Sequence, residues 1–220
     1  MTDGLNARFT KDPVAFLDSD GVWDINATGV NGAFQPIYKL DQNNVGSFDL
    51  YRTSDSTVNL RDKSAVSFWA TSATDFFKEP TVKAYYLNSI LNKTNSFTVS
   101  THADYFFTDT ITGCSFMAFG SNRLNLTVSH ANAFEPAKVV IPLTTQEQTV
   151  QNSPCAVKIV YGASQYRAFT AKANTVVKPE DAIVTIIGWR RSDGWHFYAR
   201  RRVNGWGSGN QYALGGAFEI

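Results

Sequence analysis

The stretch of sequence that decides the fold runs from Ser115 to His130 and reads SFMAFGSNRLNLTVSH. In its second half, the residues at positions 124, 126 and 128 are apolar and those between them are polar, which is the two-residue period of a strand with one buried face. Its first half is an apolar run that ends at Gly120-Ser121-Asn122, a sequence typical of a tight turn. The sequence therefore predicts a β-hairpin with strands over Ser115–Phe119 and Arg123–His130.

Further strands and two helices are predicted from the rest of the chain. Asp12 is a good helix cap and Pro13 a good first helical residue, so we expect a short helix over residues 12–17. The spacing of aromatic and aliphatic residues between Asp75 and Asn92 approximates a helix face and predicts a longer helix there. Short apolar runs bounded by Gly, Asp or Pro predict strands at residues 65–70, 96–100, 138–143, 156–161, 182–189 and 195–203.

Length and composition indicate one globular domain over residues 1–220. The chain is 43% hydrophobic and 18% charged, which is too apolar for a disordered protein. Aromatic residues make up 14%, which favours a β-rich core, and no repeat or linker divides the chain. We therefore predict an α+β fold, with a sandwich-like β core and a few peripheral helices and loops in a single domain.

Charge and hydropathy limit the partners. The net charge of +1 gives no overall field for nucleic acid, so we expect no nucleic-acid partner. No segment approaches the roughly 18 apolar residues of a membrane helix, and the N-terminus lacks the pattern of a secretory signal. Cys114 and Cys155 are too few for a disulfide framework, although one bridge between them stays open. We expect a monomer without membrane contact.

Cys114 is the candidate nucleophile. Gly113 precedes it at a predicted loop-to-strand corner, where a glycine lets the backbone bend and leaves the thiol open to a substrate. The hairpin brings His130 back beside Cys114, and an imidazole there would lower the pKa of the thiol and act as its base. Thr108 could hold the imidazole through its hydroxyl or backbone carbonyl. A buried packing pair of Cys and His is the competing interpretation.

The segments Phe106-Phe107-Thr108 and Ile111-Thr112-Gly113-Cys114, with the strand that ends at His130, resemble the cytotoxic necrotizing factor-like glutamine deamidases, most closely the Burkholderia lethal factor branch of that family. The resemblance covers roughly 30 residues and departs from the family signature at Thr112, which replaces a serine, and at Ile111, which replaces a leucine. It implies a triad of Thr108, Cys114 and His130, with Gly113 and Thr112 supporting the turn and the oxyanion.

The resemblance also implies a function. It indicates a toxin or effector, secreted or delivered into a host cytoplasm, that deamidates a glutamine of a host protein without metal or organic cofactor. The lethal-factor likeness favours a translation initiation helicase as the target, whose loss would inhibit translation, over a Rho-type GTPase. Transglutamination or proteolysis at the same site remains an enzymatic alternative. A β-sandwich binding module that uses the basic and aromatic segment at residues 189–206 is the non-enzymatic one.

The other candidate residues have structural interpretations. We expect His102 to face solvent or to lie in a turn, His196 to lie at the surface or in packing, and Cys155 to be a buried structural thiol. Three histidines without close Cys/His spacing make a zinc site an unfavoured prediction. For residues 189–206, a hairpin with its arginines in solvent and its aromatics in the core is the simpler prediction.

Overall fold

A computed structural model describes residues 4–19, 40–52, 58–62, 81–90, 92–132, 143–167, 182–204 and 211–220. Its two short N-terminal helices are α1 (Leu5–Lys11) and α2 (Pro13–Ser19). Helix α2 begins as predicted, because Asp12 Oδ1 accepts the N–H of Ala15 at 2.9 Å and Pro13 is the first helical residue. A third helix, α3 (Leu143–Gln151), lies in the second half of the chain.

The larger of two sheets has the strand order β11-β10-β9-β5-β3-β1-β2, and β12 also pairs with β10. Neighbouring strands in it are antiparallel apart from β3 and β5, which pair in parallel so that Leu87 stands opposite Thr108. Its strands are β1 (Val45–Arg52), β2 (Val58–Asp62), β3 (Val82–Leu87), β5 (Tyr105–Thr108), β9 (Ala182–Arg191), β10 (Gly194–Asn204), β11 (Gln211–Ala213) and β12 (Phe218–Glu219).

The smaller sheet contains the predicted hairpin and has the strand order β4-β7-β6-β8. Its strands are β4 (Lys93–Val99), β6 (Ser115–Asn122), β7 (Asn125–Asn132) and β8 (Val157–Tyr161). The hairpin of β6 and β7 is antiparallel, with Phe116 opposite His130. Strand β6 extends past its predicted end, and β7 begins two residues after its predicted start and extends past its predicted end. The turn lies at Arg123-Leu124 rather than at Gly120-Ser121-Asn122.

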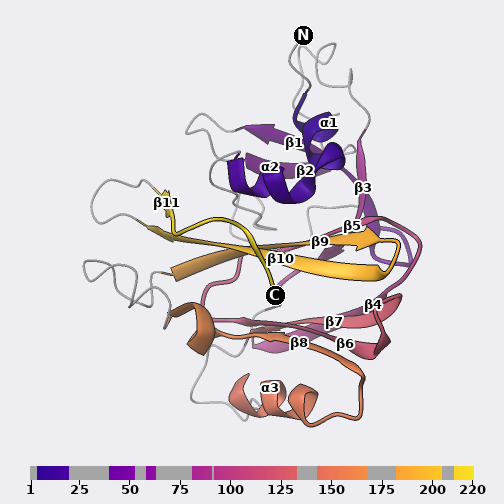
Figure 1. The fold of residues 1–220 in the computed structure, drawn as a ribbon, viewed down its shortest axis with the longest axis vertical. Helices are drawn as coiled ribbons and strands as arrows, with labels where there is room; N and C mark the ends of the chain where they lie inside the picture. The colour runs from indigo at the N-terminus through magenta and orange to yellow at the C-terminus, as the bar shows by residue number, and fades with distance from the viewer. Residues whose placement is uncertain are drawn as a thin grey trace.

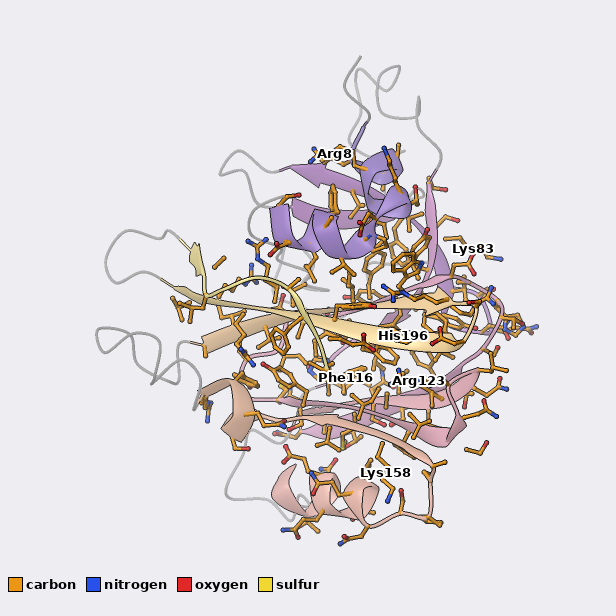
Figure 2. All side chains as sticks on the ribbon, in the orientation of Figure 1. Arg8, Lys83, Phe116, Arg123, Lys158 and His196 are labelled. Atoms are coloured by element: carbon orange, nitrogen blue, oxygen red, sulfur yellow. The ribbon has the colours of Figure 1, made fainter. Side chains whose placement is uncertain are left out.

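The elements stack in layers: α1 and α2, the larger sheet, the smaller sheet, then α3 (Figure 1). The main core fills the space between the sheets, where Phe106, Phe116 and Phe197 pack with ring centroids 5.0–5.8 Å apart. Figure 2 shows Phe116 in this space. A second core joins α1 and α2 to the outer face of the larger sheet, and a small third one joins α3 to the smaller sheet. The predicted α+β, sandwich-like single domain is confirmed.

The helix predicted over residues 75–92 is wrong where the structure describes it, because Val82–Leu87 forms strand β3. This strand lies inside the larger sheet and is covered on both faces, so Ala84, Tyr85, Tyr86 and Leu87 are all buried. A strand buried on both faces loses its two-residue alternation and is then hard to distinguish from a buried helix by periodicity.

Most other predicted strands are confirmed. Those at residues 96–100, 156–161, 182–189 and 195–203 correspond to β4, β8, β9 and β10. The strand predicted at 65–70 lies outside the described residues, as does all of the one predicted at 138–143 except Leu143, where α3 begins. No helix in the described part of the chain is both long and apolar enough to cross a membrane.

Candidate active site

Cys114 lies at the corner where the loop after β5 enters β6. Gly113 takes a φ of 77°, in the left-handed region that glycine adopts without strain, and this directs the chain into the strand. The loop is tied to the larger sheet by a pair of backbone hydrogen bonds between Ile111 and Val184, at 2.8 and 2.9 Å. The carbonyl of Thr112 accepts the Cys114 thiol at 3.7 Å. The corner predicted at Gly113 and Cys114 is therefore present.

His130 and Thr108 meet across the space between the two sheets. His130 lies on β7 of the smaller sheet and Thr108 at the end of β5 in the larger one, and both are fully buried. Thr108 Oγ1 lies 3.0 Å from His130 Nδ1 and donates its only proton to the carbonyl of Leu87 at 2.8 Å. Because a hydroxyl has one proton to give, Thr108 Oγ1 accepts the N–H of His130 Nδ1.

This chain of hydrogen bonds fixes the tautomer of His130. With the proton on Nδ1, the neutral ring carries a free electron pair on Nε2. Nε2 is buried and has no hydrogen-bond partner among the described residues. The neutral imidazole therefore has its accepting nitrogen unoccupied.

The register of the hairpin places Cys114 on the same face of the smaller sheet as His130, one diagonal position away. Ser115 stands opposite Ala131 and Phe116 opposite His130, so Cys114, one residue earlier, comes opposite Asn132. Cys114 is then a diagonal neighbour of His130, a relation in which residues lie about 7–8 Å apart and long side chains touch. Cys114 and Phe116 both belong to the core between the sheets, so the thiol and the imidazole lie on the same face.

Burial sets the resting charge of both groups. It raises the pKa of the Cys114 thiol to about 11 and lowers the pKa of His130 to about 4. The thiol pKa was expected to be lowered, but in the resting protein it is raised, because loss of hydration outweighs the hydrogen bond to the Thr112 carbonyl and the charge of Arg167. Near neutral pH the pair is a thiol and a neutral imidazole.

Two further residues hold the backbone around Cys114. Tyr166 is fully buried on a helical turn after β8, and its hydroxyl donates to the Cys114 carbonyl at 3.1 Å. Ser115 donates its hydroxyl to Glu147 Oε1 of α3. These contacts join segments 32 and 52 residues apart, so no local pattern in the sequence pointed to Tyr166 or Glu147.

Asp109, the residue after Thr108, is a buried acid near the thiol. Its carboxylate accepts the hydroxyl of Tyr86 and the backbone N–H of Ser89, and its charge helps to raise the pKa of Cys114. Ser89 in turn accepts Asn132 Nδ2 at 2.8 Å. The ends of β3, β5 and β7 thus meet in a polar cluster beside Cys114.

The remaining candidates lie apart from this site. His102 is held by Ser100 and Tyr85, at 3.0 and 3.3 Å from its Nδ1, within the predicted turn. His196 is nearly buried between Asp193 and Glu219, at 2.9 and 2.7 Å. Cys155 is half-buried, not buried as predicted. Both cysteines are free, so the Cys114–Cys155 bridge does not form.

The basic and aromatic segment is mainly the predicted hairpin of β9 and β10, with residue 206 outside the described part of the chain. Trp195 and Phe197 are fully buried and Tyr198 nearly so, which removes these aromatics from any binding face. Arg202, however, is buried beside Thr110, contrary to the prediction of solvent-exposed arginines.

Removing the Thr108 hydroxyl is expected to reduce activity while keeping the shape of the site. Thr108→Val leaves Nδ1–H of His130 without its acceptor in a buried place, which costs about 1–3 kcal/mol of stability. It also frees the ring to take the wrong tautomer, so we expect a loss of turnover of about a hundredfold. Thr108→Ser keeps the hydroxyl and should retain most activity. Equal activity of the Val and Ser variants would contradict this role for Thr108.

Acid is expected to destabilise the fold through His130. The folded chain keeps this imidazole neutral down to about pH 4, whereas the ordinary value is 6.5. Below pH 6.5 the unfolded chain binds a proton that the folded chain does not, so stability falls as the pH falls toward 4 and is unaffected above 6.5. The full loss is about 3 kcal/mol, since each pH unit between the two pKa values is worth about 1.4 kcal/mol.

Urea unfolding at pH 7 and pH 4.5 measures this effect. Wild type should lose more stability between the two pH values than His130→Gln, whose side chain does not titrate. The same loss in both proteins would show that other groups cause the acid sensitivity.

The sequence matches no protein-family model and no curated protein. Among solved structures, the fold is similar to the C-terminal domain of CNFy from Yersinia pseudotuberculosis, with a TM-score of 0.39 and 10% identity, over 94% of this chain and 78% of that one.

Proposed function

We propose that this chain is a cysteine hydrolase that converts a glutamine side chain of a protein to glutamate. Cys114 is its nucleophile, His130 its base, and Thr108 the residue that orients the base. The observation that carries the proposal is the hydrogen-bond chain from His130 Nδ1 through Thr108 Oγ1 to the Leu87 carbonyl. The imidazole has a fixed tautomer and an unoccupied Nε2 on the face of the sheet that also carries Cys114, as a general base for that thiol requires.

The neutral resting pair determines how the reaction starts. A thiol with a pKa of about 11 and an imidazole with a pKa of about 4 do not exchange a proton in the resting site near pH 7. His130 Nε2 therefore takes the proton of Cys114 as the sulfur attacks the carboxamide carbon, when the negative charge passes to the substrate oxygen. The Cys114 backbone N–H, at the turn made by Thr112 and Gly113, stabilises that oxyanion, a contribution of roughly 3–4 kcal/mol per donor.

The second half of the reaction returns the enzyme to its starting state. Protonated His130 gives its proton to the departing nitrogen, the carbon–nitrogen bond breaks, and ammonia leaves behind a thioester on Cys114. His130 then takes a proton from water, whose oxygen attacks the thioester carbon. The carbon–sulfur bond breaks, the proton returns to sulfur, and the product is a glutamate side chain. Neither a metal nor an organic cofactor enters these steps.

The proposed substrate is a protein of a host cell. This chain reaches it as a delivered toxin or effector and acts as a monomer in the host cytoplasm. A translation initiation helicase is the first target to test and a Rho-type GTPase the second. Both come from the sequence resemblance at residues 106–114 and His130. A glutamine that becomes an anion loses its donor hydrogens, which is enough to disable a functional site.

Mass spectrometry of host-cell lysate treated with the protein tests the proposal. We expect glutamine-to-glutamate conversion at few positions with wild type and none with Cys114→Ala. The translation helicase and Rho GTPases are examined first, with an added primary amine in a parallel sample. Amine capture on the glutamine would indicate transglutamination, a cut chain would indicate proteolysis, and an unmodified lysate would favour a binding module.

A further inference from the structure

A groove runs along the outer edge of β8, and Cys114 is not part of its lining. Its volume is about 540 Å³, and it is lined by residues 158–161 of β8, by residues 218–220 at the C-terminal end, and by Arg123 and Arg201. Side chains of a strand alternate between its two faces, so four consecutive residues line one groove where it follows the edge of their strand. We call this feature the β8-edge groove.

The backbone of β8 is open on the side of this groove. Among the described residues β8 pairs with β6 alone, and it is the last strand of the smaller sheet. An edge strand presents a row of N–H and C=O groups that can take up a further strand. The opposite wall belongs to the larger sheet, because Phe218 and Glu219 form β12 beside β10. Figure 1 shows the C-terminus between β10 and β8.

The side chains of the groove carry more positive than negative charge. Its cations come from three elements: Lys158 from β8, Arg123 from the turn between β6 and β7 (Figure 2), and Arg201 from β10. Glu219, 3.9 Å from Arg123, is the acidic side chain among the described lining residues. The balance stays positive when the terminal carboxylate of Ile220 is counted. The complementary partner is therefore an acidic one.

The charge of Arg201 is held at the groove by its neighbours. Its Nε donates to the Tyr161 hydroxyl at 2.6 Å, and its guanidinium lies 4.0 Å from the ring centroid of Phe218. A single lysine on an edge strand commonly serves to keep other strands away. Two further cations from other elements, one of them fixed against an aromatic ring, are not explained by protection of one edge.

We propose that the β8-edge groove binds an extended acidic segment of a partner protein, which adds to β8 as a further strand and places its carboxylates beside the three cations. Backbone pairing supplies the affinity, and the cations select the acidic sequence. The inference does not depend on the chemistry proposed for Cys114, so binding and catalysis can be measured separately.

Fluorescence anisotropy with a labelled peptide tests the proposal on the full chain at low salt. The probe spans the five residues of β8 and alternates glutamate with threonine. One control peptide carries glutamine in place of glutamate, and a second keeps the glutamates but has every amide N-methylated, so it cannot pair as a strand. We expect the probe to bind at least about tenfold more tightly than either control.

Lys158→Glu is expected to weaken binding of the probe by about fivefold or more, because it reverses a charge beside the bound segment. Lys158 is exposed, so the fold should tolerate the change. Lys93→Glu is the matched control, because Lys93 is an exposed lysine on β4, the strand at the opposite edge of the same sheet. An unchanged affinity in Lys158→Glu, or an equal loss in Lys93→Glu, would overturn the groove as the binding site.

The control peptides separate strand addition from simple attraction of charge. Equal binding of the N-methylated peptide, with displacement of the probe by tripolyphosphate, would assign a site for small anions and overturn strand addition. Equal binding of the glutamine peptide would overturn the acidic partner. Failure of the probe to bind at millimolar concentration would overturn the proposal as a whole.

Discussion

Cys114→Ala is expected to abolish deamidation, with turnover reduced by at least about ten-thousandfold, because no other group at the site can form the thioester. The fold should survive the change. Cys114 is buried at the edge of the core, but alanine removes only its sulfur, which costs about 1 kcal/mol at most sites of this kind. The measurement is the rate of glutamate formation in the target protein, with the urea midpoint as the test of folding.

Cys155→Ala is the matched control for this prediction. Cys155 is a half-buried free thiol that lies just before β8, and it has no place in the proposed steps. Its variant should keep wild-type turnover. Residual activity of Cys114→Ala at a level close to wild type would end the assignment of Cys114 as nucleophile.

His130→Gln is the second large effect, with an expected loss of turnover of about a thousandfold or more. The glutamine side chain is close in size and keeps hydrogen-bonding capacity toward Thr108, but it cannot accept the thiol proton. Since the Cys114 pKa is about 11, the remaining activity should rise steeply with pH as hydroxide replaces the missing base. The measurement is the pH–rate profile from pH 6 to 10.

The control for His130 is His102→Gln. His102 binds Ser100 and Tyr85 in a turn and has no contact with the thiol, so its loss should leave the pH–rate profile unchanged. A His130→Gln enzyme with a wild-type profile would contradict a base role for the imidazole and would favour a packing role in the core.

The sequence alone determined the hairpin and the candidates it carries. Alternation over residues 124–128 and the apolar run before it are local properties, and a two-residue period defines a strand whatever it packs against. Asp12 and Pro13 determined the start of α2 for the same reason, because a cap depends on its immediate neighbours. Gly113 marked the corner at Cys114, because glycine has no Cβ and adopts a positive φ without strain.

Only the tertiary structure decided which groups act on one another at the site. Thr108 and His130 lie in different sheets, and their hydrogen bond exists because the two sheets face each other across the core. Tyr166 reaches the Cys114 carbonyl from 52 positions along the chain, on the turn that follows the pairing of β8 with β6. The same packing excluded water from the thiol and the imidazole, which moved both pKa values toward the neutral forms. Burial is a property of the assembled layers, so the sequence could bring the thiol of Cys114 and the imidazole of His130 to one hairpin but could not give their resting charge.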